Sequence, residues 1–373
     1  MRRLLRLILL RPVLWAAEKF SSKPERERIF KALTTLFEGI TREPGKKGLV
    51  IPFEFNTGKF IIFSDQHKGT RNGADDFILA EPSYLAALDH YALNDFFLIS
   101  LGDSEELWEN TLSGIKKHNS ANFEAEKRFA IKNMFVKIFG NHDLFWDNDP
   151  FASWHLKGIY GESVKVYEGV ILQSTVHSSL PINPSPLTIF LTHGHQGDSH
   201  SDGNWFSKFF VANIWAPMQA YLRINPNTPA YDISKKSIHN TIMYEWSATR
   251  EHTLLVTGHT HQPVYESLTH LERLYKKFQQ ASVKKDPVEL DALRQEIRKR
   301  EKDFTAVSVD YMTMRPTYFN TGCCCYSDGD ITGIEIDNGC IRLIKWEMVD
   351  ESPCRVVLEE KALEELVKRE GIS

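Results

Sequence analysis

One short stretch limits the folds open to this chain more than any other: an apolar run that stops abruptly at an acid and a histidine. The run FIIF occupies residues 60–63 and is followed by SDQH at residues 64–67. Its aromatic and β-branched side chains predict a strand buried on both faces of a parallel sheet. Asp65 and His67 stand just past its carboxyl end, where open α/β sheets build their sites. One residue apart, they point the same way in extended chain, and their oxygen and nitrogen donors suit a divalent transition metal.

The same combination of a strand followed by metal-type residues recurs four more times. Further apolar strands are predicted at 96–101, 134–139, 187–191 and 252–257, with helices at 82–94 and 120–132. The β-α-β-α-β order that opens this series predicts an α/β fold with its site at the strand ends. These ends carry Asp65, His67, Asp103, Asn141, His142, His193, His195, His259 and His261. Even seven ligands from this set of nine residues are too many for one tetrahedral zinc. They suit two adjacent metals bridged by a carboxylate.

The composition narrows the class of protein. The chain has 373 residues, of which 42% are hydrophobic and 25% charged, as in a soluble globular protein of one large domain or two. A net charge of −4 gives no general basic field, so no nucleic-acid partner is expected. The 14 histidines point to metal chemistry. The five cysteines do not resemble a disulfide framework, which indicates a reducing compartment and a cytoplasmic location.

The five motifs resemble those of the calcineurin-like metallophosphoesterase superfamily. They are Asp65-x-His67, Gly102-Asp103, Gly140-Asn141-His142-Asp143, His193-Gly194-His195 and Gly258-His259-Thr260-His261. The resemblance covers roughly residues 59–346 without the insertions. It implies a four-layer αββα sandwich of two sheets flanked by helices, with two metals at the sheet ends, in a domain expected over 49–350.

The resemblance also implies a role for each motif residue. Its two metal sets are Asp65, His67 and His261 on one side and Asn141, His193 and His259 on the other, with Asp103 as the bridge. His142 resembles the family's histidine that contacts the phosphate and assists the leaving group, so His142 and Asp103 are the expected catalytic residues. Asn141, His142 and His195 are the expected substrate contacts, although His195 alternatively lies behind the metal ligands. Asp143 either orients His142 or is an ordinary structural aspartate.

The implied activity is hydrolysis of a phosphate ester by a hydroxide that bridges two divalent metals. Manganese is the expected metal, with iron or zinc as alternatives, and the bond is a phosphomonoester, a phosphodiester or a pyrophosphate. Three further features are similar to the bacterial UDP-2,3-diacylglucosamine pyrophosphatases: the acidic and aromatic tail SEELWE at 104–109 after Gly102-Asp103, the insertion between His193 and His259, and the sequence GHTHQP at 258–263. The alternative function is therefore hydrolysis of a lipid-linked nucleotide at the membrane surface. His142 and Gln262 stand where those enzymes carry arginines.

Residues 1–20 are basic and aliphatic, and the apolar run is too short to span a bilayer. Arginines beside leucines and Trp15 suit an anionic headgroup layer, so one prediction is peripheral contact of residues 1–20 with a membrane. The alternative is a helix packed on the domain or on a second subunit. Residues 1–48 as a whole are predicted to form an N-terminal helical arm, with a helix over 21–41.

Four other segments carry predictions. The aromatic stretch 205–223 and a helix over 233–251 form either a cap-like insertion, about 204–251, or a helix pair that packs on the core. The charged segment of about 266–303 predicts a solvated helical hairpin divided at Pro287. Residues 351–373 are predicted to form a C-terminal helix. The cysteines at 323–325 are expected to alternate along a strand as small apolar residues, and so not to converge on one ion.

Overall fold

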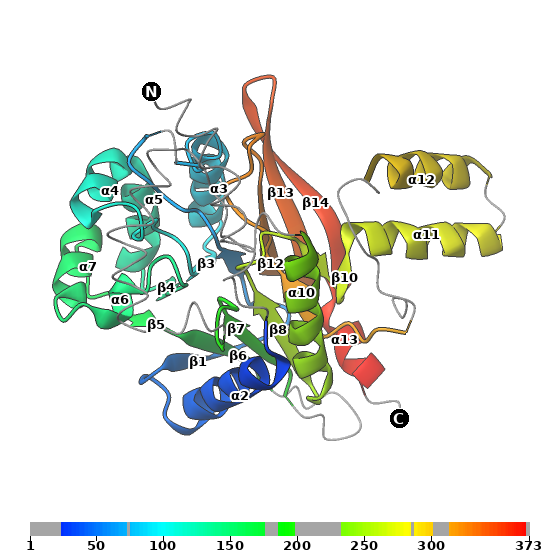
Figure 1. Ribbon diagram of the computed structural model, residues 1–373, viewed down its shortest axis with the longest axis horizontal. Helices are drawn as coiled ribbons and strands as arrows, with labels where there is room; N and C mark the ends of the chain where they lie inside the picture. The colour runs from blue at the N-terminus through cyan, green and yellow to red at the C-terminus, as the bar shows by residue number, and fades with distance from the viewer. Residues whose placement is uncertain are drawn as a thin grey trace, which may run out of the picture.

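The structure is a computed structural model that describes residues 24–72, 75–175, 186–197, 233–284, 287–300 and 313–370. Two seven-stranded sheets form its centre (Figure 1). The order in the first sheet is β14 (Ser352–Ala362), β13 (Cys340–Val349), β12 (Ile331–Asp337), β2 (Phe60–Phe63), β3 (Phe97–Leu101), β4 (Phe135–Ile138) and β5 (Val166–Tyr167). The order in the second is β1 (Gly48–Phe53), β6 (Gly169–Ser174), β7 (Thr188–Thr192), β8 (Thr253–Thr257), β11 (Tyr318–Asn320), β9 (Val264–Tyr265) and β10 (Leu268–Thr269).

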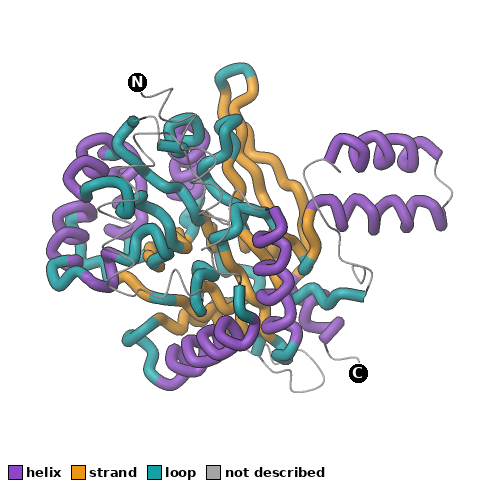
Figure 2. Tube along the Cα trace, viewed as in Figure 1, coloured by secondary structure: helices purple, strands orange, loops and turns teal. Residues whose placement is uncertain are grey.

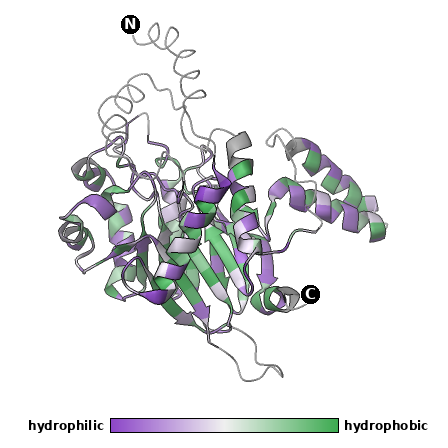
Figure 3. Ribbon diagram, turned by 60° about the horizontal axis from the view of Figure 1, so that its bottom comes forward, coloured by the Kyte–Doolittle hydropathy of each residue, from purple (hydrophilic) through white to green (hydrophobic). Residues whose placement is uncertain are grey.

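Alternating side chains divide each inner strand between two apolar cores. Ile62 of β2 belongs to the core between the sheets, together with Leu191 of β7 and Val256 of β8. Ile61 and Phe63 of the same strand pack instead among helical residues on the outer face of the first sheet. Because successive strand residues point to opposite faces, a strand that is apolar throughout requires cover on both sides. Figure 3 shows this hydrophobic interior.

Helices provide that cover on the outer face of each sheet (Figure 2). The first sheet is covered by α3 (Glu81–Leu93) and α5 (Ser120–Ile131). The second is covered by α2 (Arg26–Arg42) and α10 (Ile233–Ala248). The order of layers is therefore helix, sheet, sheet, helix, and the predicted αββα sandwich is confirmed. The remaining helices on the side of the first sheet are α4 (Leu112–His118), α6 (Phe145–Asn148) and α7 (Ala152–Tyr160).

Strand direction brings the motif loops together. β2, β3 and β4 are parallel neighbours in the first sheet, and β7 and β8 are parallel neighbours in the second. The carboxyl ends of parallel neighbours lie at one edge of a sheet, where open α/β sheets form their sites. All five predicted motifs come directly after these five strands.

The region of the predicted cap is part of the core as far as the structure describes it. Ile242, Met243 and Trp246 of α10 are buried with Phe190 of β7 and Leu33 of α2. This half of the predicted insertion therefore packs on the second sheet, as the core-packing alternative required. The aromatic stretch 205–223 lies outside the described residues, and so do residues 1–20. The helix of the predicted N-terminal arm, α2, packs its stripe of apolar residues on the same face.

The charged segment forms the predicted helical hairpin, with α11 (His270–Lys284) and α12 (Pro287–Arg300) side by side and projecting from the body (Figures 1 and 2). The prediction of a helix over 351–373 is wrong for its first half. Residues 352–362 extend β13 as the antiparallel strand β14, and α13 begins only at Leu363 and ends at Glu370. None of the described helices is long and apolar enough to cross a membrane.

Candidate metal centre

The loops after the five strands place two carboxylates among several imidazoles. Asp65 Oδ1 lies 3.2 Å from His261 Nε2, 3.9 Å from His67 Nε2 and 4.0 Å from His193 Nε2. Asp103 Oδ2 lies 3.1 Å from His193 Nε2 and 3.8 Å from His67 Nε2. Both acids are fully buried or nearly so. Residues from distant parts of the sequence thus converge on one point between the two sheet edges.

Each acid uses one oxygen on the backbone and turns the other to the imidazoles. The backbone N–H of His259 donates to Asp65 Oδ2 at 3.0 Å, and that of His142 donates to Asp103 Oδ1 at 2.7 Å. A Cβ at Gly258 would lie 2.4 Å from Asp65 Oδ2, and one at Gly140 would lie 2.2 Å from Asp103 Oδ1. Only glycine therefore permits this approach, which explains the glycine that opens the third motif and the one that opens the fifth.

The loops carry backbone strain at the motif residues. Five of them have a positive φ: Asp65 (54°), His67 (51°), Asp103 (50°), His259 (68°) and His261 (54°). Each costs about 1–2 kcal/mol relative to the right-handed conformation. Such strain persists only where the surrounding structure enforces it, and it concentrates at functional sites.

The donor atoms fit bound cations because several of them have no other partner. The buried atoms without a hydrogen bond include Asp65 Oδ1, Asn141 Oδ1, His193 Nε2 and His259 Nε2. Buried polar atoms in proteins are almost always paired. Two clusters of potential ligands share Asp103, one with His67 and His142 and one with His193 and His259. The residues can therefore hold metal ions, and the charge they supply is negative at the centre.

The histidines report this negative charge in their pKa values. Burial by itself lowers the pKa of His67, but contacts with Glu106, Asp103 and Asp65 outweigh it and raise the pKa to about 10. The pKa of His193 is raised to about 9, against the effect of burial, chiefly by Asp103 and Asp65. The same carboxylates that stabilise an imidazolium ion stabilise a metal cation held by the neutral imidazole.

Two residues beyond the predicted set complete the centre. Glu106 bonds both His67 Nδ1 and His142 Nδ1 at 2.9 Å, and Trp108 stacks on the ring of His142 with centroids 4.3 Å apart. Burial alone raises the pKa of Glu106, but the two histidines lower it to about 2. Glu106 therefore orients one metal-type histidine and the predicted catalytic histidine together. The only signal in the sequence is the acidic and aromatic tail after Gly102-Asp103.

The structure decides between the alternatives for Asp143. Its carboxylate accepts hydrogen bonds from the backbone N–H groups of Ser104 and Gly140, at 2.9 and 2.5 Å. It thus ties the second motif to the third, and Glu106 is the residue that meets the His142 ring. Burial raises the pKa of Asp143 to about 6.

His195 lies beside the predicted ligand His193 and against the ring of Phe139. Its ring centroid is 5.4 Å from that of His193 and 5.9 Å from that of Phe139. Its Nδ1 is buried without a hydrogen bond. Burial and then His193 lower its pKa to about 3, so the ring is neutral at physiological pH. The predicted contact between His195 and a substrate stays a prediction.

A buried charge cluster lies beneath the loops of the first sheet. Its members are Lys68, Glu105, Glu126 and Lys137, all with fully buried side chains. Lys137 Nζ lies 2.9 Å from Glu105, and Lys68 pairs with Glu105 and Glu126. Because Lys68 comes directly after His67 and Glu105 directly before Glu106, this cluster fixes the backbone of both loops.

A neutral network performs the same task beneath the loops of the second sheet. It consists of Asn240, Thr260, Gln262, Tyr318 and Asn320. Asn240 of α10 donates to Gln262 Oε1 at 2.9 Å and accepts from Thr260 Oγ1 at 3.1 Å. Its neighbour His239 lies 2.7 Å from the carbonyl of Gly194 through Nε2. Thus α10 connects the fourth motif with the fifth.

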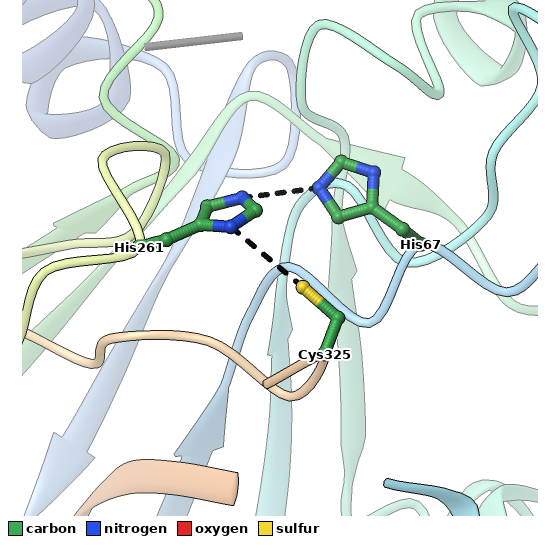
Figure 4. Close-up of side chains that lie close together, drawn as sticks. All are labelled: His67, His261 and Cys325. Atoms are coloured by element: carbon green, nitrogen blue, oxygen red, sulfur yellow. Dashed lines mark hydrogen bonds between the residues drawn. The ribbon is translucent and has the colours of Figure 1, made fainter. Parts of the chain in front are cut away.

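The prediction for the three cysteines is wrong in its geometry. They lie in the loop after β11 and not along a strand. Cys324 faces the outer core of the first sheet, whereas Cys325 Sγ lies 3.7 Å from His261 Nδ1 (Figure 4). His67, His261 and Cys325 form a third cluster of potential ligands. Cys323 interacts with the same histidine: burial raises the pKa of its thiol, but hydrogen bonds with Cys325 and His261 outweigh this effect and lower the pKa to about 5. A loop, unlike a strand, lets two of the three thiols reach His261.

Comparisons with known proteins agree with the motifs. Residues 58–263, more than half of the chain, match the family model described as calcineurin-like phosphoesterase. Among solved structures the chain is similar to vacuolar protein sorting 29 from Cryptosporidium parvum, with 10% identity over 82% of this chain and 98% of that chain. The TM-score is 0.31, too low to support any inference about function. No curated protein matches the chain.

Proposed function

The chain belongs to the calcineurin-like phosphoesterase family, whose members are metal-dependent phosphoester hydrolases, and we propose that it cleaves its substrate with two divalent cations. The observation that carries the proposal is the set of buried polar atoms without hydrogen-bond partners at the centre. An unpaired buried polar atom costs about 1–3 kcal/mol, and two cations would pair this set. The cations we propose are manganese, with iron or zinc as alternatives, because the donors are oxygen and nitrogen atoms.

The proposed ligands divide into two sets that share Asp103: Asp65, His67 and His261 on one side, and Asn141, His193 and His259 on the other. Bound divalent cations supply acidified water near neutral pH and neutralise charge on the phosphate. The chain itself supplies rigid placement. Asp65 and Asp103 each have one oxygen fixed by a backbone N–H, which directs the other oxygen to the cations.

His142 is the proposed proton donor to the leaving oxygen, and Asn141 beside it the proposed contact to the phosphate. The bond from His142 Nδ1 to Glu106 leaves Nε2 for the substrate. The Glu106 carboxylate accepts from Nδ1 and fixes the orientation of the ring, while Trp108 restricts its rotation. A protonated imidazole in this position can protonate the leaving oxygen.

Hydrolysis of p-nitrophenyl phosphate and bis-p-nitrophenyl phosphate tests the proposal. Each is offered to the metal-free chain and to the chain with Mn²⁺, Fe²⁺ or Zn²⁺. We expect metal-dependent cleavage of at least one ester, and a loss of about 10²- to 10⁴-fold in His142→Ala with bound metal unchanged. His155→Ala, on α7 and paired with Asp149, is the matched control and keeps full activity. A chain that holds two ions and cleaves neither ester would overturn the proposal.

A lipid-linked nucleotide with a pyrophosphate bond is the second candidate substrate. The sequence of residues 1–20, with arginines among leucines, favours it, because such segments bind anionic membrane surfaces. The protein would then act at the cytoplasmic face of a membrane. Flotation with anionic and neutral vesicles, with and without residues 1–20, tests the contact. A panel of phosphate esters that includes nucleotide-diphospho-lipids tests the substrate, and equal rates on the lipid-free analogue would exclude this candidate.

A further inference from the structure

The partner of His261 distinguishes it from the other metal-type histidines of the centre. His67 places Nδ1 against the Glu106 carboxylate, and His193 donates from Nδ1 to the carbonyl of Leu101 at 2.9 Å. Both are arrangements usual for a histidine that binds a metal through its other nitrogen. His261 instead has a sulfur at this position, Cys325 Sγ, 3.7 Å from Nδ1 (Figure 4). Its outer partner is therefore an atom that can be oxidised.

The inner nitrogen of His261 faces the cation position. His261 Nε2 lies 3.2 Å from Asp65 Oδ1 and 3.2 Å from His67 Nε2. Asp65 Oδ1 is fully buried and accepts no hydrogen bond. This unpartnered oxygen points to a ligand independently of the cysteine. Cys325 thus contacts the outer nitrogen of His261, while the inner nitrogen of His261 faces Asp65 Oδ1, which has no hydrogen-bond partner.

We propose that Cys325 is an oxidation-sensitive positioning residue, whose thiol holds His261 in place and whose oxidation by a hydroperoxide releases the cation bound there. The sulfur attacks one oxygen of the peroxide, so that an S–O bond forms and the O–O bond breaks. The sulfur loses two electrons and becomes a sulfenic acid. The second peroxide oxygen leaves with the thiol proton, as water when the oxidant is hydrogen peroxide.

Space at the ring explains why oxidation would release the cation. A separation of 3.7 Å between Sγ and Nδ1 leaves no room for an oxygen atom between them, so an oxygen added on this side of the sulfur displaces the imidazole or the loop. Metal sites require ligand distances within about 0.2 Å of their usual values, and loss of an outer partner typically costs about 10- to 100-fold in metal affinity. Solvent reaches this thiol before its neighbours, since Cys325 is half-buried whereas Cys323 and Cys324 are buried.

The test measures metal retention and not activity. The full chain is loaded with Zn²⁺, which has no redox chemistry of its own, and zinc per chain is measured before and after one equivalent of hydrogen peroxide. The variants are Cys325→Ser, which keeps a polar group of similar size, and Cys354→Ser as the matched control. Cys354 is the more exposed thiol and lies on β14, where its oxidation cannot reach His261.

We expect about two zinc ions per chain in all three proteins before oxidation. After peroxide, the wild type and Cys354→Ser lose about one ion, and Cys325→Ser keeps both. Mass spectrometry should place the added oxygen, or a disulfide formed from it, on Cys325. Equal zinc loss in Cys325→Ser, no zinc loss in a wild type whose Cys325 is oxidised, or no oxidation of Cys325 would each overturn the proposal.

If the Cys325→Ser variant does not fold, a second measurement on the wild type replaces it. Iodoacetamide added to the folded wild type alkylates the same thiol, and we expect the same loss of about one zinc ion. Full zinc retention after alkylation of Cys325 would overturn the proposal. The inference rests on the metal centre of the proposed function, but different results would refute the inference and the function. A chain that binds zinc and hydrolyses no phosphate ester refutes the function and leaves the zinc-release test intact.

Discussion

The two sheets hold their halves of the centre by different electrostatic means. The loops of the first sheet carry the acids Asp65 and Asp103, and beneath them lies the charge cluster of two lysines and two glutamates. The loops of the second sheet carry histidines, and beneath them lies a neutral network of amides and hydroxyls around Asn240. Both arrangements fix strained loops at a sheet edge.

The difference reflects the needs of each set of ligands. A buried lysine can lie near the acids because a glutamate pairs with it, and the cluster as a whole carries no net charge. An unpaired lysine near the histidines of the second sheet would repel a bound metal cation, and it would also disfavour its own charged form. A neutral network avoids this repulsion and lets the imidazoles bind as neutral ligands. The cluster is therefore expected to be more sensitive to single substitutions, because removal of one partner leaves a buried charge.

The largest expected effect is at the residue that joins the two halves. Asp103→Ala should abolish hydrolysis and lower bound metal, because Asp103 is the only acid shared by two of the ligand clusters that the described residues form. Metal content by mass spectrometry and the rate on an aryl phosphate check this. Asp149→Ala, an acid outside the centre, is the control. A variant that keeps two ions and full activity would remove the shared role.

The next effect tests the charge cluster directly. Lys137→Met should cost about 3–5 kcal/mol of unfolding free energy, because Lys68 is then the one lysine left to balance the two buried carboxylates of Glu105 and Glu126. Urea denaturation measures the loss. The double variant Lys137→Met/Glu105→Gln should recover part of it, since no unpaired charge remains. A loss below about 1 kcal/mol for the single variant, within the range of exposed pairs, would contradict the comparison.

A matched substitution in the neutral network should cost less. Asn240→Ala removes one hydrogen-bond partner from each of two hydroxyls and one amide, with a loss of about 1–3 kcal/mol. The measurement is the same urea denaturation, so the two layers are compared on one scale. The comparison would fail if this loss exceeded that of Lys137→Met. Asn56→Ala, at an exposed turn and without a positive φ, is the control and should leave the midpoint unchanged.

The smallest expected effect is the contribution of the Glu105 pKa to the free energy of unfolding, which is measured by lowering the pH. Burial raises the pKa of Glu105, but Lys137 and Lys68 outweigh it and lower the pKa from 4.5 to about 2. A lowered pKa means that this stabilisation is complete above pH 4.5 and is lost as the pH falls towards 2. Urea midpoints at pH 6, 4 and 3 should therefore fall more steeply for the wild type than for Glu105→Gln. Parallel curves would show that Glu105 has the same pKa in the folded and unfolded chains.

Local chemistry explains why the strand-end motifs could be predicted. The run FIIF at 60–63 is apolar at every position, and such a strand needs cover on both faces. An acid and a histidine directly after it must then lie at a sheet edge. The hairpin of α11 and α12 was equally accessible, because its apolar spacing, its mixed charge and Pro287 are all local features. The strand β14 was not, because it is polar and partly exposed, and its form depends on pairing with β13.

The sequence by itself determined the layered α/β fold and the residues at the strand ends, because short-range patterns specify both a buried strand and the residues directly after it. Only the tertiary structure decided which residues support them. Glu106 meets His67 from 39 positions away, and Asn240 meets Thr260 from another element. Cys325 reaches His261 only because its loop leaves the sheet. These contacts depend on how the two sheets and α10 pack, which no local pattern of residues encodes.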